Sequence, residues 1–553
     1  MWPALRDFLN VPEALTGKGV RIAIVDGDFP NHPDITTNQH RTSHKVMVMD
    51  PDPVPKEFNV ESGPWKGGAH GLWAAAAAAS SGAESRGLYK GVAHDADLFL
   101  IAQYFTGQSR QPEKRDEAHL RSLEWIRDNW RKYEIRGVLT ARKSALDASL
   151  LPWQSDPVRV LCEEIASEGV LIVSGSGNLS DRTAAMAEAA APSVLSVGGV
   201  VIPSNGDPGS ADVFPGCRGT TFEGKWIPEI LAPAANIVLP HGTDKEIEHH
   251  YYGKIDDLPR RYARLHGTSF AGPMVLGAAA CLWQARPEWT SQEMKSALIE
   301  SSIQQPGWTD LRAGLVSVRA ALGSTPSATR RDHGIWPRQP WTVLRSLSVA
   351  SRLGMLGDSD PEHVVAAILS FVGDENALPD NVWIPFRKCL RHTDPHVRAA
   401  GACALAMGRS LVNASEIIEA IRDDSPYVRA AAVNLLRNHS DLWSECTKAL
   451  PDLFNDTNPD VRYAALQLAV QMADPRMAGA ILAGLEEDAR ENRISSFEVR
   501  RNALESITDH RLEMTPPYRH GEPFYSDDLR ASRLDLARRW NEWIREEWLP
   551  ERA

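Results

Sequence analysis

Four side chains in the first half of the chain have the types that acyl transfer needs. In chain order they are a carboxylate, an imidazole, a primary amide and a hydroxyl: Asp26, His70, Asn178 and Ser269. A hydroxyl becomes a nucleophile when an imidazole takes its proton and a carboxylate orients that imidazole, and an amide N–H then stabilises the oxyanion. These four are far apart along the chain, so this chemistry depends on the elements that position them.

Ser269 stands at the start of a long apolar stretch. Gly267 and Thr268 precede it, and the run that follows, 270–283, is long enough for a buried helix. Backbone N–H groups and the helix dipole favour negative charge that develops beside a hydroxyl at a helix N-terminus. The alternative is an ordinary N-cap serine, which is the commoner role for a serine before a helix.

Asp26 and Asn178 each follow an unbroken apolar run, 22–25 and 170–173 respectively. Such runs are typical of parallel strands covered on both faces, and open α/β sheets bind ligands at the carboxyl ends of their strands. Both side chains are therefore expected at that edge. In isolation, Asp26 also fits a turn aspartate that bonds its own loop, and Asn178 a loop asparagine in the left-handed conformation.

His70 separates a glycine-rich segment, Gly67-Gly68-Ala69, from the alanine run 74–79. The small residues predict a helix that packs closely on its neighbours. The glycines leave room for the imidazole to approach another part of the backbone. A structural or solvated histidine remains the alternative for this position taken alone.

The segments between these residues predict alternating strands and helices. We expect a strand at 91–101, an amphipathic helix at 120–133, a strand with its exit loop at 145–152, and a helix from 155 to 169. Strand, helix and strand in succession imply parallel pairing with right-handed crossovers. The first half is therefore predicted to be an α/β domain with a mostly parallel sheet.

Together these motifs resemble the sequence blocks of the subtilisin-like serine peptidases, the subtilases. The stretch 22–26 with 31–35 is similar to their aspartate block, and His70-Gly71 before the alanine run to their histidine block. Ser176-Gly177-Asn178 resembles the oxyanion asparagine turn, and 267–273 the serine block. The resemblance extends over about residues 10–322 and implies the three-layer subtilisin-like fold.

The resemblance also implies a role for each matched residue. Asp26, His70 and Ser269 would form the catalytic triad, with Asn178 and the Ser269 N–H as oxyanion donors. The residues that would line the cleft and pair with the substrate backbone are Ser149, Leu150, Leu151, Ser176 and Gly177. Leu151 stands where the family usually has glycine, which predicts a narrower or more apolar specificity pocket.

No cofactor or metal is expected for this chemistry. The pairs His40/His44 and His249/His250 each lack a third ligand, so surface histidines are the preferred interpretation. The six cysteines are dispersed without a Cys-x-x-Cys pair and are expected to be buried free thiols.

The second half of the chain contains a repeat. A polar residue, proline and Val-Arg recur in the segments 394–400, 425–431 and 458–465, and the arginines Arg398, Arg429 and Arg462 follow at intervals of 31 and 33 residues. Segments at 360–367 and 497–500 look like degenerate outer copies. The pattern resembles HEAT repeats of the α-solenoid class, with four or five units. We expect the arginines to link adjacent repeats rather than to contact a ligand.

These patterns divide the 553 residues into four parts. The predicted boundaries are 1–323 for the subtilisin-like domain, 324–343 for a proline-punctuated linker, 344–527 for the HEAT-like solenoid and 528–553 for a C-terminal capping helix. A chain of this length is expected to hold two or more domains.

Charge and composition limit the partners. The net charge of −12 argues against a general nucleic-acid or anionic-membrane binder. The N-terminus shows no secretory signal, and the resemblance begins within the first twenty residues, so no N-terminal pro-segment is expected. A cytoplasmic protein is predicted.

The function that these observations favour is an intracellular serine endopeptidase whose substrate is a protein or peptide. Its HEAT-like domain would recruit the substrate or a regulatory protein, or would cover the cleft until a signal releases it. The rival hypothesis is a catalytically silent peptidase fold that acts as a scaffold for protein–protein interaction. A third is a maturation protease dedicated to one precursor.

Overall fold

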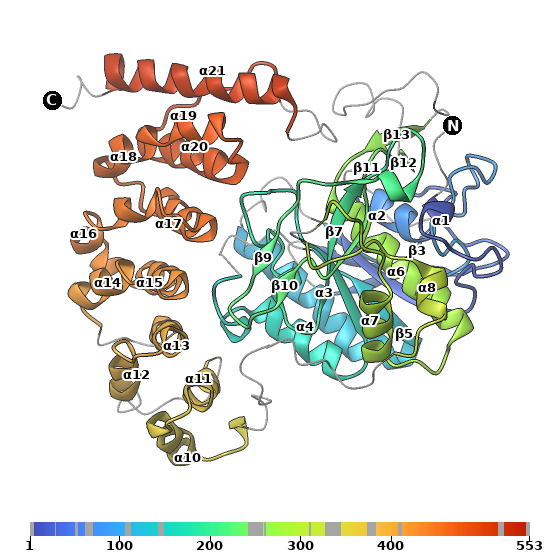
Figure 1. Ribbon diagram of the computed structural model, residues 1–553, viewed down its shortest axis with the longest axis horizontal. Coiled ribbons are helices and arrows are strands. Elements are labelled where there is room, and N and C mark those ends of the chain that lie inside the picture. Colours follow the sequence, from blue (N-terminus) through green and yellow to red (C-terminus); the bar gives the residue numbers. More distant parts are fainter. Residues whose placement is uncertain are drawn as a thin grey trace.

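The structure is a computed structural model of the whole chain. It describes residues 5–27, 29–49, 54–60, 70–104, 112–141, 149–241, 258, 261–308, 311–326, 344–372, 383–407, 412–517 and 525–548. Two parts lie side by side in Figure 1, a sheet half formed by the described residues up to 326 and a helical half formed by those from 344 onward. Most of the predicted linker, residues 327–343, lies outside the described residues.

A mostly parallel sheet forms the centre of the sheet half, in the order β11-β7-β6-β5-β1-β4-β2-β3. Strand β1 lies between β4 and β5 and pairs in parallel with both. Parallel pairing also joins β2 to β4, β5 to β6, β6 to β7, and β7 to β11. Antiparallel pairing occurs between β2 and β3 and between β7 and β8. Their bounds are Arg21–Asp26 (β1), Ser43–Met49 (β2), Lys56–Asn59 (β3), Asp97–Tyr104 (β4), Ile135–Leu139 (β5), Leu171–Gly175 (β6), Leu195–Val201 (β7), Asp212–Val213 (β8) and Ile230–Ala235 (β11).

Helices cover both faces of this sheet, which confirms the predicted three-layer α/β arrangement. The first face packs on α2 (His70–Ala79), α6 (Thr268–Ala285), α7 (Ser291–Glu300) and α8 (Val318–Leu322). The second face packs on α3 (Pro112–Tyr133) and α4 (Pro157–Ser167). Neighbouring β1 residues belong to opposite cores, since Ile22 and Ile24 pack with α2 and α6 whereas Ala23 and Val25 pack with α3 and α4.

Local predictions differ from the structure in two places. The strand expected at 91–101 begins only at Asp97, because residues 92–95 form a turn that packs against α2. The strand expected at 145–152 is not seen in its described part, where residues 149–151 form a bend. Residues 145–148 lie outside the described residues. The helix start at Asp156-Pro157 is confirmed, since Asp156 accepts a hydrogen bond from the Val158 N–H.

Two small antiparallel pairs lie beside the main sheet. One joins β9 (Gly219–Thr220) to β10 (Trp226–Ile227), and the other joins β12 (Ile237–Pro240) to β13 (Tyr262–Leu265). The second pair leads directly into α6, so it brings the chain to the position of Ser269.

Gly277 sets the closeness of α2 and α6, the helices that carry His70 and Ser269. A Cβ at this position would lie 2.7 Å from the Ala78 carbonyl oxygen and 2.9 Å from the Val92 Cβ. Neither neighbour is the end of a flexible side chain, so a larger residue would push the two helices apart.

Gly277→Ala is therefore expected to destabilise the fold by about 1–3 kcal/mol, the usual range for overpacking a core. The midpoint of urea denaturation should fall accordingly. Gly479→Ala is the matched control, because no atom lies within 4 Å of the added Cβ in α18 (Ala478–Ala483). That substitution should raise stability by about 0.5–1 kcal/mol through the unfolded state. Equal midpoints for the two variants would contradict the close-packing argument.

The helical half is a stack of antiparallel helices. Five inner helices pack one on the next, and Figure 1 shows most of them on the side that faces the sheet half: α11 (Pro361–Leu369), α13 (Pro395–Ala406), α15 (Pro426–Asn438), α17 (Pro459–Met472) and α20 (Ile494–Thr508). The outer helices are α12 (Trp383–Cys389), α14 (Ala414–Ile421), α16 (Trp443–Cys446), α18 and α19 (Leu485–Arg490). The terminal helix α21 (Asp527–Trp543) packs on α19. The predicted HEAT-type array is confirmed.

Two of the three repeated arginines link successive repeats as the sequence predicted, whereas the described hydrogen bonds of Arg462 go to the Asp456 and Thr457 carbonyls before its own helix. Arg398 binds both carboxylate oxygens of Asp423 at 2.8 Å, and Arg429 binds those of Asp456 at 2.6 and 2.8 Å. Each guanidinium also donates to backbone carbonyls of the turn before its own helix. Paired and partly buried in this way, the arginines stabilise the stack.

Two further predictions about composition can be compared with the structure. All six cysteines are buried and free. Among the described residues, no helix has the length and apolar character needed to cross a membrane.

Candidate active site

Asp26 and His70 meet at the carboxyl end of β1. Asp26 is the last residue of that strand, and His70 is the first residue of α2. The His70 Nδ1 atom lies 2.9 Å from Oδ1 and 2.8 Å from Oδ2 of Asp26. Asp26 Oδ1 also accepts a hydrogen bond from the Gly27 N–H at 2.6 Å. The Gly27 N–H therefore fixes the carboxylate that orients the imidazole.

This pairing changes the proton affinity of the imidazole. Burial lowers the pKa of His70, but the charge of Asp26 and the hydrogen bond that His70 donates to it outweigh burial, so the pKa lies above its ordinary value of 6.5. The side chain of His70 is still 43 % exposed, whereas that of Asp26 is 14 % exposed. A ring that is fixed on one edge and accessible on the other suits proton exchange with a bound reactant.

Ser269 is half-buried in the first turn of α6, next to this pair. Its neighbour Phe270 places its ring centroid 6.0 Å from that of His70. The second residue of a helix has no acceptor for its N–H within the helix. Helix α6 itself therefore supplies no acceptor for the Ser269 N–H.

Asn178 follows β6 and is fixed by the residue before Ser269. Its Oδ1 accepts hydrogen bonds from the Thr268 N–H at 2.8 Å and from the Thr268 hydroxyl at 3.0 Å. The carbonyl oxygen of the amide is thus engaged, which directs the Nδ2 group to the opposite side. Gly267, at a φ of +146°, adjoins that group, because a Cβ there would lie 3.3 Å from Nδ2.

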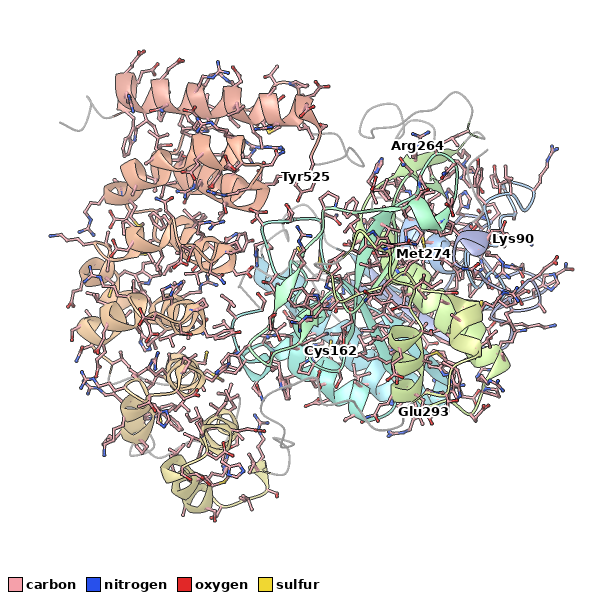
Figure 2. All side chains as sticks on the ribbon, in the orientation of Figure 1. Lys90, Cys162, Arg264, Met274, Glu293 and Tyr525 are labelled. Carbon is pink, nitrogen blue, oxygen red and sulfur yellow. The ribbon has the colours of Figure 1, made fainter. Side chains whose placement is uncertain are left out.

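The Asp26–His70 pair and the Asn178–Thr268 pair therefore both adjoin the first turn of α6, which carries Ser269. Thr268 was missed by sequence reasoning, although it links Asn178 to the helix that carries Ser269. Its position between Gly267 and Ser269 was the available signal. Figure 2 shows the side chains of the sheet half, where Met274 of α6 lies inside the domain.

The residues predicted to pair with substrate are engaged within the protein. Ser149 is buried, and its carbonyl accepts the Phe222 N–H at 2.7 Å. Leu150 and Leu151 are buried in the apolar core of the helical half, where Phe222 joins them. The Leu151 carbonyl accepts a hydrogen bond from Arg159 at 2.9 Å.

Ser176 and Gly177 form the turn before Asn178. The Ser176 N–H donates to the Val197 carbonyl at 2.8 Å, and the Gly177 N–H donates to the Thr268 hydroxyl at 3.1 Å. The Gly177 carbonyl accepts the Cys217 N–H at 3.0 Å. Their substrate-binding role, like that of residues 149–151, stays a prediction.

The sequence did not identify the residues through which the helical half contacts this region. The residue after the repeat proline contacts the sheet half in three successive repeats. His396 and Tyr427 pack their rings at 5.1 and 5.6 Å from Phe222, and Asp460 binds Arg182. The signal available in the sequence was that this position varies in an otherwise repeated pattern.

The described residues hold no group of three or more His, Cys, Asp or Glu side chains that is arranged to bind a metal. His40 is exposed, whereas His44 is half-buried and stacks on Phe99 at 4.5 Å. The surface prediction is therefore correct for His40 and only partly correct for His44, because β2 turns that ring toward the ring of Phe99 on β4. His249 and His250 lie outside the described residues.

Comparison with known proteins gives two matches to family models. The model described as the subtilase family matches residues 17–323, and the model described as HEAT repeats matches residues 414–499. The first match covers more than half of the chain and includes all four candidate residues.

A curated relative is the serine protease AprX of Bacillus subtilis (strain 168). It is 27 % identical over 298 residues, which cover 53 % of this chain and 63 % of AprX. The chain thus spans less than two thirds of the length of that relative.

Solved structures with similarity include fervidolysin from Fervidobacterium pennivorans, a keratinolytic enzyme related to subtilisin. It has a TM-score of 0.45 and 19 % identity, over 59 % of this chain and 46 % of that chain. Sphericase has a TM-score of 0.40 and 20 % identity, over 54 % of this chain and 89 % of that chain.

Proposed function

Because the chain belongs to the subtilase family, we propose that it is a serine endopeptidase that hydrolyses peptide bonds through an acyl-enzyme. The observation that carries this proposal is the Asp26–His70 pair, at 2.8 Å, beside the helix N-terminus that presents Ser269. A histidine without a catalytic role would not need a carboxylate that a backbone N–H holds in place. We retain the boundaries 1–323, 324–343, 344–527 and 528–553 as the proposed domain division.

In the proposed mechanism the Ser269 oxygen attacks the carbonyl carbon of the substrate while His70 Nε2 accepts the hydroxyl proton. The Asp26 carboxylate holds the proton on Nδ1 and stabilises the imidazolium that forms. The resulting oxyanion accepts hydrogen bonds from the Ser269 N–H and the Asn178 amide.

The tetrahedral intermediate then collapses, and the C–N bond breaks as His70 returns its proton to the leaving amine. Water attacks the acyl-enzyme with His70 again as the base. The carboxylic acid product and the free Ser269 hydroxyl complete the cycle.

We propose further that the helical half recruits a protein substrate or a regulatory protein. Solenoids of stacked helices present extended surfaces for protein partners. An intracellular, cytoplasmic location is part of the same proposal, and the six buried free thiols support it because they need no oxidising compartment.

A fluorophosphonate probe tests the proposed activity directly. The wild type should be labelled at one serine, and Ser269→Ala should lose the label completely because the hydroxyl that His70 activates is gone. Ser180→Ala is the control and should keep full labelling, since the hydrogen bond from Ser180 to Tyr525 is donated by its backbone N–H and survives the change. Unlabelled wild type, folded by circular dichroism, would favour the silent scaffold.

Cut-site mapping then separates the enzymatic alternatives. A proteome digested by wild type and by Ser269→Ala should differ at many sites if the enzyme is a general endopeptidase. New termini in a single protein would instead indicate a dedicated maturation protease.

A further inference from the structure

The loop that begins at Asn178, residues 178–183, is held by the helical half of the chain. Five of its six residues form hydrogen bonds to helical-half residues, through the side chain or the backbone: Asn178, Ser180, Asp181, Arg182 and Thr183. We call this set of contacts the oxyanion-loop clamp. Its partners in the helical half are Asp460, Tyr463, Ser495, Ser496 and Tyr525.

Tyr525 makes the contact nearest to the candidate oxyanion donor. Its hydroxyl donates to the Asn178 carbonyl at 3.2 Å and accepts the Ser180 N–H at 2.6 Å. Burial raises the pKa of Tyr525 to about 12, so the hydroxyl keeps its proton and serves as both donor and acceptor. Figure 2 shows Tyr525 at the edge of the helical half that faces the sheet half.

Asp181 fastens the middle of the loop to α20. Its carboxylate accepts the Ser495 hydroxyl at 2.8 Å and the backbone N–H groups of Ser495 and Ser496 at 3.3 and 3.2 Å. These N–H groups lie in the first turn of α20, where they have no partner within the helix and where the helix dipole favours a carboxylate.

Arg182 closes the loop with a buried ion pair. Its Nε lies 2.7 Å from Asp460 Oδ1, and the two side chains are only 2 % and 0 % exposed. The Thr183 N–H also donates to Asp460 at 3.2 Å, and the Arg182 guanidinium lies 3.6 Å from the ring centroid of Tyr463. A pair so fully desolvated needs this geometry, because either charge alone would be strongly unfavourable.

We propose that the clamp positions Asn178 for catalysis, so that the helical half is a structural part of the oxyanion hole and Tyr525 is a positioning residue. This inference rests on the proposed peptidase function and deepens it. The amide of Asn178 is oriented from one side by Thr268, in the sheet half, and its backbone is held from the other side by Tyr525. Both restraints are needed to fix a donor, since a shift of about 1 Å at a reacting centre lowers the rate by about 100-fold.

The hydrogen bonding of the Asn178 amide predicts whether loss of the clamp raises or lowers the rate. Asn178 Oδ1 is engaged by Thr268, which leaves Nδ2 beside Gly267, two residues before Ser269. The clamp therefore keeps the Asn178 Nδ2 group available as a donor. Loss of the clamp should slow hydrolysis. The same reasoning makes the helical half a route of control, because a protein that shifts α20 or α21 would move the loop.

Tyr525→Phe in the full-length protein tests the proposal. It removes one hydroxyl and keeps the ring, so kcat for a peptide substrate should fall by about 10-fold to 100-fold while KM changes by less than about twofold. An oxyanion donor acts in the transition state, which is why kcat and kcat/KM should fall together. The rate should be expressed per active site, with active sites counted as the final extent of fluorophosphonate labelling.

Tyr427→Phe is the matched control. Its hydroxyl donates to the Thr221 carbonyl at 3.5 Å, in the same interface but away from the loop, and its removal should leave kcat within about twofold. Ser495→Ala provides a second test, because it removes one bond to Asp181 and should lower kcat in the same direction.

The outcomes of these experiments distinguish failure of the clamp proposal from failure of the peptidase proposal. Wild type that is labelled and active, with Tyr525→Phe unchanged or faster per active site, would overturn the clamp and leave the peptidase proposal intact. A rise in KM with constant kcat would equally overturn it, since it would assign Tyr525 to substrate binding. Wild type that takes no label would end the peptidase proposal itself.

Discussion

Replacing His70 by alanine is expected to lower kcat by about six orders of magnitude, the size of effect known for the corresponding change in subtilisin itself. Among the described residues, His70 is the titratable side chain in contact with Asp26, and it lies on the helix that packs against α6. Without it, the Ser269 hydroxyl has no base and keeps its proton. Hydrolysis of a chromogenic peptide, measured over hours with concentrated enzyme, gives the residual rate.

The residual activity should be that of the oxyanion donors and substrate binding alone. His70→Ala combined with Ser269→Ala should therefore be no slower than either single variant, because residues that act as a unit are not additive. His40→Ala is the control, since that imidazole is exposed in a turn of the same domain. If the two losses in kcat multiplied in the double variant, His70 and Ser269 would not act in the same step.

Asp26→Asn is expected to lower kcat by about 10⁴-fold, with little change in the fold. The Gly27 N–H, at 2.6 Å from Oδ1, should keep the carbonyl oxygen of the new amide in place. Its NH₂ group would then occupy the position of Oδ2, 2.8 Å from His70 Nδ1, and would donate to that nitrogen. The imidazole proton would move to Nε2, so no lone pair would face Ser269.

The pH profile gives an independent measure of the same pair. His70 must be neutral to act as a base, so kcat/KM of the wild type should rise with pH through a pKa above 6.5. Asp26→Asn removes the charge that raises the pKa, and burial then lowers it, so the acid limb should move to lower pH. Asp97→Asn, on the neighbouring strand β4, is the control and should leave both the rate and the profile unchanged within about twofold. An unshifted acid limb in Asp26→Asn would contradict the assignment of the limb to His70.

The core of the sheet half was predictable because its signals are local. The apolar runs before Asp26 and Asn178 predicted buried parallel strands, and both became strands of the central sheet. The alanine run after His70 became α2, and the apolar stretch after Ser269 became α6. Each motif carries enough information within ten residues or so to define its own element, and the order of the motifs indicated the family.

The arginine links between repeats were predictable for a related reason. A repeat places the same side chain in the same position of each helix, so Arg398 and Arg429 had to meet equivalent neighbours. His44 illustrates the limit of local reasoning. Its burial depends on Phe99, which belongs to a strand more than fifty residues away.

By itself, the sequence determined the candidate triad, the asparagine that accompanies it and the helical repeat, because each of these is encoded in short segments with characteristic spacing. Only the tertiary structure decided that the helical half closes on the loop after Asn178. That contact joins Ser180 to Tyr525 across 345 residues of chain, and it depends on the relative placement of two folded parts. No local pattern specifies such a placement, since a tyrosine before a helix and a serine in a turn are each compatible with many neighbours.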